Sequence, residues 1–285
     1  MRKSIALIIT SILVLSGCNK QQSVSDRLLN EVEKAIAINP DSASNLLKSI
    51  SSAEKLDDKA FARWCMLSGK ITDEIFNSIL PTYQLERAYD WYSSHGSPDE
   101  QVQILIYLGR SYFADGDYDK AMSIYTNALD IAGKNKLNNL IGYTYDYIGD
   151  LYREKFMRTE AIKRYEIAAE YFKKEKNTDS YACALRDIGR EYAQMDSLSH
   201  ALNILIIADS VAANTSNINV TASINNALGN IYSMQNKYDK AEEYLLKALL
   251  TGREKMPDYV ALIDLYTASN SINKAKELLS KIPQD

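Results

Sequence analysis

A forty-residue repeat dominates the chain. Each copy has a glycine, followed by tyrosine three positions on and by alanine twelve and nineteen positions on. The glycines are Gly109, Gly149, Gly189 and Gly229, and the tyrosines are Tyr112, Tyr152, Tyr192 and Tyr232. Tyrosine makes up only 20 of 285 residues, so composition alone does not explain four tyrosines in register. A fixed period of this length predicts a solenoid, which presents an extended surface for function.

Each copy predicts two antiparallel helices. In the first copy, Leu108 and Tyr112 are four residues apart. A second set, at offsets of four and seven, consists of Ala121, Tyr125 and Ala128. These spacings put each set on one face of an α-helix. We expect the small glycine and alanine to let the two helices approach closely. We also expect the tyrosine and the large residue sixteen positions after the glycine to fill the space between neighbouring hairpins.

The pattern resembles the tetratricopeptide repeat. The family pattern is Leu-Gly-x-x-Tyr on the first helix and Ala-x-x-x-Tyr-x-x-Ala on the second, and it stands here at residues 108–112 and 121–128. The resemblance implies an all-α, right-handed superhelical solenoid of stacked antiparallel helix hairpins. The period of forty exceeds the family's usual 34, which implies longer helices.

We expect about seven hairpins. Residues 102–285 form the regular array, with four 40-residue repeats and a shorter C-terminal repeat that contains Tyr266 and Ala275. Residues 25–101 form degenerate hairpins, in which Gly69, Leu85 and Ala88 keep the register while Thr72 and Pro81 replace the tyrosine and the first alanine. Irregular terminal repeats are typical of such arrays because the ends must be capped.

The first residues predict export. Arg2 and Lys3 precede a largely apolar run over residues 5–15, which is shorter than the roughly 20 residues of a membrane-spanning helix. The sequence Leu-Ser-Gly-Cys at residues 15–18 resembles the bacterial lipobox, in which cleavage precedes a cysteine that is then acylated. An ordinary signal peptide with an incidental cysteine is the alternative interpretation.

The lipobox resemblance implies a lipoprotein signal peptide over residues 1–17, a lipid anchor on Cys18 and a tether over residues 18–24. Several acyl chains would give durable membrane attachment. Asn19 follows the cysteine. By resemblance to the enterobacterial sorting rule, this residue favours the outer membrane, with the protein facing the periplasm.

Composition and motifs narrow the classes of function. The formal net charge is −4, and removal of residues 1–17 would make it −6. No basic excess therefore exists to neutralise nucleic-acid phosphates. The two histidines belong to no metal-binding motif, and no glycine-rich phosphate loop is present. We expect no enzyme activity, no cofactor, no metal site and no nucleic-acid partner. Cys65 and Cys183 lie three repeats apart, so we expect both to be free thiols.

The resemblance also places a ligand groove on the first helix of each hairpin. In the family this groove is lined chiefly by the residue after the glycine and by the residue three before it. The residues at or beside these positions are Tyr107, Arg110, Tyr143, Asp146, Tyr147, Asp150, Arg153, Arg186, Arg190, Asn226 and Asn230. We expect Asp146 and Asp150 to face Arg186 and Arg190 of the next repeat, with Arg110 on the other flank of Asp150.

Two interpretations of these groove residues remain open. They can form a ladder of ion pairs that fixes the stacking of repeats, where exposed pairs contribute about 0–1 kcal/mol each. They can also bind a peptide or small ligand, with tyrosines for apolar contact and arginines for carboxylates. The two roles are compatible.

The sequence thus predicts a membrane-anchored envelope lipoprotein that acts as a non-enzymatic scaffold for a protein or peptide partner. One alternative is a lipoprotein subunit of an outer-membrane or pilus assembly machine. Another is the sensing component of a periplasmic regulatory system, which the N-terminal half resembles.

Overall fold

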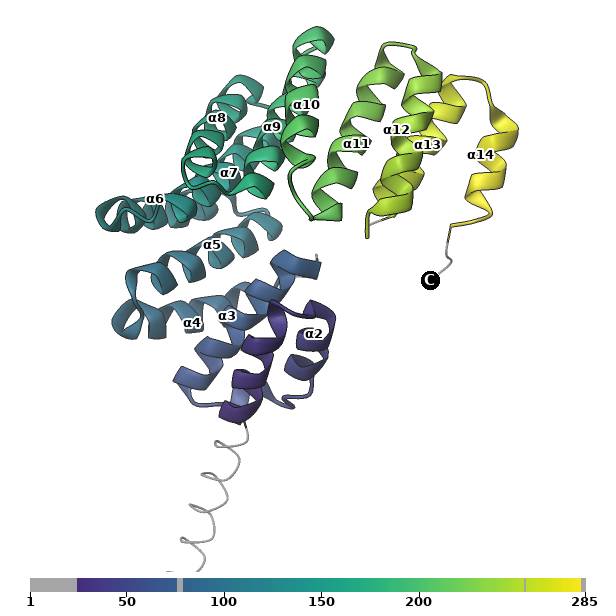
Figure 1. Ribbon diagram of the computed structural model, residues 1–285. Helices are drawn as coiled ribbons and strands as arrows, with labels where there is room; N and C mark the ends of the chain where they lie inside the picture. The colour runs from purple at the N-terminus through teal and green to yellow at the C-terminus, as the bar shows by residue number, and fades with distance from the viewer. Residues whose placement is uncertain (1–24, 76–78, 254, 283–285) are drawn as a thin grey trace, which may run out of the picture. The chain divides into compact units, whose positions relative to one another are not determined.

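The computed structural model describes residues 25–75, 79–253 and 255–282. Within these residues the chain is helical and contains no strand (Figure 1). None of the helices described there combines the length and the apolar character needed to cross a membrane. The chain divides into two compact units, and the boundary falls between Asn135 and Lys136. The expected division between residues 101 and 102 marks where the regular repeats begin, and it stays a prediction.

The first unit consists of successive helical pairs. Its first described helix covers residues 25–36. The helices that follow in this unit are α2 (Pro40–Lys48), η1 (Ala53–Lys55), α3 (Asp58–Ile75), α4 (Thr82–His95), α5 (Pro98–Ala114) and α6 (Tyr118–Asn135). Consecutive α-helices from α2 onwards, other than those that cross the unit boundary, pack on one another. A buried cluster that includes Leu29, Val32 and Leu47 joins the first three helices of the chain.

The second unit repeats the same arrangement. Its helices are α7 (Asn138–Glu154), α8 (Arg158–Lys174), α9 (Thr178–Gln194), α10 (Leu198–Ala212), α11 (Ile218–Met234), α12 (Tyr238–Thr251), α13 (Met256–Ala268) and α14 (Ile272–Leu279). The odd-numbered helices are the first helices of their hairpins. Among them, α9 contacts α11 and α11 contacts α13. The described residues of the two units make seven consecutive helical pairs, as expected.

The turn inside each regular hairpin has the same geometry. The residue four positions after the repeat tyrosine has a positive φ, and the backbone N–H of the next residue donates to the tyrosine carbonyl at 2.7–2.9 Å. This is the Schellman arrangement that ends a helix. The positive-φ residues are Gly116, Phe156, Asp196, Asn236 and Asn270. Only one of the five turns therefore uses the glycine that this backbone favours.

The repeat glycine gives room to a large side chain from its own hairpin. A Cβ on Gly109 would come within 2.3 Å of the Tyr125 ring, and a Cβ on Gly149 within 2.5 Å of the Tyr165 ring. Gly189 has the same relationship with Leu205. The large residue therefore fills space inside its own hairpin, because the glycine leaves a gap where the two helices cross. Tyr165 and Leu205 also belong to a buried cluster that includes residues of α8, α9, α10 and α11, in keeping with the expected packing between hairpins.

The repeat tyrosine does reach the preceding hairpin. The hydroxyl of Tyr112 on α5 donates to Glu86 on α4, and the hydroxyl of Tyr266 on α13 donates to Glu242 on α12 at 2.8 Å. A cation from the second helix of the tyrosine's own hairpin lies over both rings, Lys120 over Tyr112 at 5.0 Å and Lys274 over Tyr266 at 5.3 Å. These tyrosines thus tie consecutive hairpins together.

Candidate binding face on the first helices

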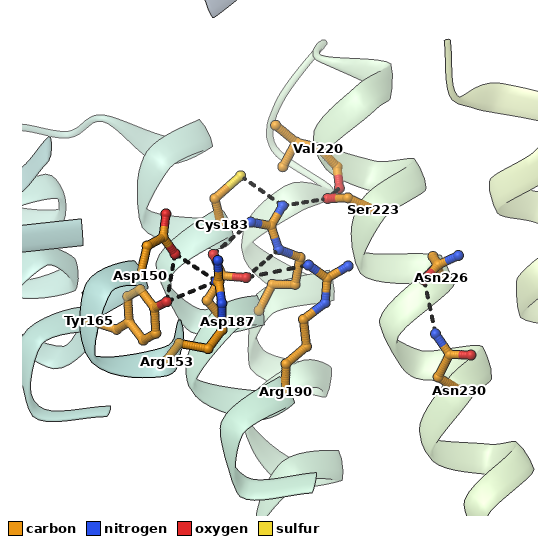
Figure 2. A network of polar contacts seen from close by, with 11 residues as sticks. Asp150, Arg153, Tyr165, Cys183, Asp187, Arg190, Val220, Ser223, Asn226 and Asn230 are labelled. Carbon is orange, nitrogen blue, oxygen red and sulfur yellow. Dashed lines mark hydrogen bonds and ion pairs between the residues drawn. The ribbon is translucent and has the colours of Figure 1, made fainter. Parts of the chain in front are cut away.

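The candidate site of the second unit lies on its first helices, where side chains four residues apart share one face. We call the following eight residues the polar row: Asp146, Asp150, Arg153, Arg186, Asp187, Arg190, Asn226 and Asn230. They come from α7, α9 and α11. Figure 2 shows most of these side chains, together with residues that contact them.

The α7 end of the polar row is held by a tyrosine from α8. The Tyr165 hydroxyl donates to Asp150 Oδ1 at 2.7 Å and accepts from Arg153 Nη1 at 2.9 Å. Arg153 Nη1 also lies 2.6 Å from Asp150 Oδ1. Burial raises the pKa of Asp150, which Arg153 opposes. Burial and the neighbouring Asp150 raise the pKa of the Tyr165 hydroxyl, so the phenol stays protonated and can donate.

Both arginines of α9 pair with an aspartate on their own helix (Figure 2). Arg186 holds both oxygens of Asp187, from Nε to Oδ1 at 3.0 Å and from Nη2 to Oδ2 at 2.6 Å. Arg190 Nη1 reaches the same Oδ1 at 3.4 Å. Asp146 and Asp150 of α7, which we expected to face these arginines, are therefore not the carboxylates that pair with them in the described residues. Asp187, which takes that place, lies one and three residues away from them on the same helix.

The charges of this cluster act on one another. Burial by itself would raise the pKa of Asp187, but Arg186 and then Arg190 outweigh it and hold that pKa below its usual value. Burial, followed by the charge of Arg186, lowers the pKa of Arg190 to about 10. The guanidinium of Arg190 therefore lies among groups that only partly compensate its charge.

Of the three aspartates of the polar row, Asp146 is the one without an ion pair in the described residues. Its pKa is raised well above the ordinary value, by burial first and then by Asp150 and Asp187, while Arg186 opposes the shift. Its Oδ1 has no hydrogen-bond partner in the described part of the chain. Ionisation of Asp146 is therefore more costly in the folded protein than in the unfolded chain.

Several members of the predicted groove join one repeat to the next. Arg186 Nη1 donates to Ser223 of α11 at 2.9 Å and lies 3.6 Å from the Cys183 sulfur. Asn226 Nδ2 donates to Asp258 of α13 at 2.7 Å, within a buried contact. Asn226 Oδ1 in turn accepts from Asn230 Nδ2 at 3.0 Å. Arg186 and Asn226 therefore stabilise the stacking of hairpins.

The two predicted tyrosines of α7 differ in their surroundings. The Tyr143 hydroxyl accepts from Ser180 at 2.9 Å and from Asn177 at 3.1 Å, which joins α7 to the start of α9. Its ring packs edge-on against Phe172 at 4.9 Å. Tyr147 also lies on α7 and is half-buried. Tyr143 is thus part of the packing between repeats.

Tyr107 and Arg110 lie in the first unit and contact α3. The Tyr107 side chain is only 3% exposed, and its ring lies where a Cβ on Gly69 would be. Its hydroxyl donates to Asp73 Oδ2 at 2.9 Å, and Arg110 pairs with Asp73 Oδ1. Within the first unit, the carboxylate that pairs with Arg110 is therefore Asp73. The expected position of Arg110 on the flank of Asp150 crosses the boundary between the two units and stays a prediction. Tyr107 and Arg110 both link the first helices of two successive hairpins.

Three residues that organise the site are not among the predicted groove residues: Asp187, Tyr165 and Asp258. Asp187 is 6% exposed and stands two positions before its glycine, where two other repeats have tyrosine and one has alanine. A charged residue at an otherwise apolar position was the available signal. Tyr165 stands sixteen positions after Gly149, where we expected a space-filling residue, but nothing in its spacing indicates that its hydroxyl reaches the polar row. Asp258 lies outside the regular repeat register.

Comparison with known families confirms the repeats. Tetratricopeptide repeat family models match residues 105–138 and 221–256. The photosystem I assembly protein Ycf3 of Rippkaea orientalis is 32% identical over 91 residues, which are 31% of this chain. The match spans about half of that protein, 52% of its length. The chain therefore contains tetratricopeptide repeats.

Solved structures share the fold. A Rap protein complexed with competence and sporulation factor is similar with a TM-score of 0.74 and 19% identity, covering 91% of this chain and 75% of that one. BtubC from P. vanneervenii has a TM-score of 0.60 and 18% identity, covering 70% and 87%. The quorum sensor NprR from B. thuringiensis, in its apo form, has a TM-score of 0.58 and 15% identity, covering 91% and 75%. At these identities the likeness supports the all-helical fold alone.

Proposed function

We propose that the polar row of the second unit binds a protein or peptide partner, and that the chain is a non-enzymatic scaffold anchored in the cell envelope. Tetratricopeptide repeats form scaffolds for protein interactions, and two regions of the chain match them. One structural neighbour, the Rap protein, was solved in complex with competence and sporulation factor. These likenesses support a binding role for the repeats and leave the partner to be identified.

One observation carries the choice of surface. The side chains of the polar row fall into two groups that differ in exposure. Most of them form ion pairs or hydrogen bonds with neighbouring side chains and are largely buried. The Asp187 side chain, for example, is only 8% exposed and has both oxygens bound by Arg186. The other group is Arg190, whose side chain has an exposed fraction of 42%, and Asn230, which is exposed. A largely paired base with two exposed polar side chains is the arrangement that positions binding groups before a ligand arrives.

The non-enzymatic part of the proposal is supported by the state of the cysteines. Burial raises the pKa of the Cys65 thiol to about 12 and also raises the pKa of Cys183. A cysteine nucleophile needs a lowered pKa, because the thiolate is the reactive form. Both cysteines are free, as expected, and both are therefore better suited to packing than to catalysis.

The anchoring part of the proposal rests on the sequence. The signal peptide over residues 1–17, Cys18 and the tether over residues 18–24 lie outside the residues that the structure describes. With a lipid on Cys18, the repeats would be held at a membrane surface and could collect partners there. We propose the periplasmic face of the outer membrane as that surface.

Site-specific photocrosslinking in cells tests the binding face. A photoreactive amino acid in place of Asn230 should crosslink to a discrete partner that mass spectrometry identifies. The matched control is the same amino acid in place of Glu166, an exposed residue of α8. Equal capture from both positions, or capture from Glu166 alone, would move the binding surface away from the first helices. A partner that belongs to an outer-membrane or pilus assembly machine would favour that alternative role.

A further inference from the structure

Four exposed apolar side chains lie on second helices of the second unit, outside the polar row. Ile206 and Ile207 of α10 are 51% and 47% exposed, and Leu246 and Leu250 of α12 are 38% and 80% exposed. We call these four residues the outer patch. Single exposed apolar residues are ordinary on protein surfaces, whereas a contiguous group of them marks a contact surface.

The two helices that carry the outer patch are neighbours. Leu202 of α10 and Tyr244 of α12 pack against the same buried cluster. Ile206 follows Leu202 by four residues, and Leu246 follows Tyr244 by two. Ile206 and Leu246 also stand at the same place in their repeats, seventeen positions after the glycine. Because equivalent places on stacked hairpins lie next to each other, the outer patch is continuous from α10 to α12.

The fold of the repeat does not require apolar residues at this place. In the other two regular repeats the same position is occupied by Thr126 and Glu166, both of which are exposed. The inner side of α10 is supplied by Leu205 and by alanines, which are fully buried. The packing of the hairpins therefore accounts for the inner side of α10 and leaves the outer patch unexplained.

The outer surface of α10 also lacks strongly charged side chains. Its exposed residues are Ser199, His200, Asn203, Ile206, Ile207 and Ser210. On α8, the second helix of the preceding hairpin, five of the exposed residues are charged: Lys163, Glu166, Glu170, Lys173 and Lys174. Beside the patch on α12, Glu243 and Lys247 form an ion pair at 2.7 Å, so they neutralise each other. The outer patch is thus apolar and surrounded by little net charge.

This distribution of charge favours a second copy of the chain as the occupant. In a dimer with twofold symmetry, a residue near the axis meets the same residue of the other copy. A charged residue there would face its own like charge, whereas an isoleucine meets an apolar surface that complements it. The whole chain has a formal net charge of −4, so two copies repel through most of their surfaces. The uncharged surface of α10 is where this repulsion is weakest.

We propose that two copies of the chain associate through the outer patch, with the twofold axis beside Ile206 and Ile207 of α10. The apolar side chains of α10 and α12 of one copy pack on those of the other. The inference goes beyond the proposed function, since the outer patch lies on second helices and the polar row on first helices. A dimer formed in this way leaves the polar row of each copy outside the interface.

Sedimentation of the full chain in density-matched detergent tests the proposal. The measurement covers about 1–100 μM, the range in which a weak dimer dissociates. The mass should rise from one copy to two as the concentration increases. An acidic variant that carries both Ile206→Asp and Ile207→Asp should raise the dissociation constant by about tenfold or more, because like charges then meet at the axis.

A matched variant controls for the added charge. Met195→Asp combined with Met234→Asp places the same two charges at residues that are 46% and 47% exposed, next to turns of the same unit. This control should dimerise as the natural chain does, and it also controls for copies that share a micelle. Circular dichroism shows whether each variant keeps its helices.

Mixing two charge variants identifies the occupant. A basic variant, with Ile206→Lys and Ile207→Lys, should be as monomeric as the acidic variant when each is alone. An equal mixture of the two, carrying different affinity tags, should form a mixed dimer, because opposite charges then meet across the axis. Recovery of both tags together is expected of a twofold contact between copies and of no other occupant.

Three results would overturn the inference. One is a natural chain that stays monomeric up to the highest concentration. Another is a dimer that persists unchanged in the acidic variant, and the third is a mixture that forms no mixed dimer. If the chain is monomeric, binding of Cys18→Ala to phosphatidylcholine vesicles, lost when the acidic substitutions are added, would assign the outer patch to a lipid surface instead. None of these results affects the photocrosslinking test of the polar row, so the two proposals can fail separately.

Discussion

The ring of Tyr165 lies directly on Gly149, at a position where a Cβ would be 2.5 Å from the nearest ring atom. The hydroxyl of the same tyrosine donates to Asp150, the residue that follows this glycine. One side chain therefore fills the space between α7 and α8 and also orients a carboxylate of the polar row. The packing of the repeat and the geometry of the site are linked through it.

Gly149→Ala should destabilise the protein. Overpacking a tight contact costs about 1–3 kcal/mol, and the better helix propensity of alanine offsets roughly 1 kcal/mol of this. We expect a net loss of about 1 kcal/mol in the free energy of unfolding, measured by urea denaturation. Gly133→Ala is the control, since nothing lies within 4 Å of a Cβ there. That variant should be stabilised by up to about 1 kcal/mol, and a loss of stability in it would contradict the argument.

Phe156→Gly should stabilise the turn between α7 and α8. Phe156 has a φ of 57° and is 80% exposed, so it adopts a left-handed backbone without gaining burial. The same place in the first regular hairpin is occupied by Gly116. Removing the strain should raise the free energy of unfolding by about 1 kcal/mol. The loss of the weak cation–π contact between Arg158 and the Phe156 ring reduces this gain slightly.

Glu154→Gly, two residues earlier and within α7, is the matched control for that turn. Glycine in a right-handed helical position costs about 1 kcal/mol, so this variant should lose stability. The two glycine substitutions, two residues apart, should thus change the thermal unfolding temperature in opposite directions. A loss of stability in Phe156→Gly would mean that its ring makes a larger contribution than its exposure indicates.

Asp146→Asn should remove a pH-dependent cost of folding. The folded pKa of Asp146 lies above its ordinary value of 3.8, so its contribution to stability is fully present below that value. The contribution is lost as the pH rises through the folded pKa, because the folded state must then hold a buried charge. The stability of the variant relative to the natural protein should therefore increase with pH above about pH 4 and level off once the folded carboxyl is ionised.

Urea midpoints over a series of pH values measure this difference. Glu160→Gln provides a control of opposite sign, because a hydrogen bond from Lys163 lowers the pKa of Glu160 below 4.5. The stabilising contribution of ionised Glu160 is present above its unfolded pKa and is lost as the pH falls. Glu160→Gln should therefore become less stable than the natural protein as the pH rises. A difference between Asp146→Asn and the natural protein that does not vary with pH would contradict the assignment of a raised pKa.

Cys18→Ala should abolish lipidation and release the protein from membranes. In the proposed anchor the sulfur of this cysteine carries the lipid, and without it the attachment is lost. Incorporation of labelled palmitate, followed by membrane fractionation, measures both effects. Cys65→Ala is the control, since Cys65 is buried and should take no lipid. Label that persists in Cys18→Ala would refute the anchor.

The repeat register and the hairpins could be predicted from the sequence. Glycine, tyrosine and alanine at fixed offsets encode which face of each helix is buried, because the helical period of 3.6 residues converts spacing directly into position. The seven helical pairs of the described residues and the placement of the predicted residues on first helices follow from this rule. The expectations of lipidation and location remain predictions.

Only the tertiary structure decided which groups pair. Arg190 shares Asp187 on its own helix with Arg186, and Arg110 pairs with Asp73. A difference of a few ångströms in the separation of two charged groups decides whether they form an ion pair. That separation depends on side-chain direction and on how closely two helices pack. Sequence spacing sets the face on which a residue lies, whereas the atoms that it meets across the interface depend on packing. For that reason the exposure of Arg190 and of Asn230 could be recognised only once their neighbours were in place.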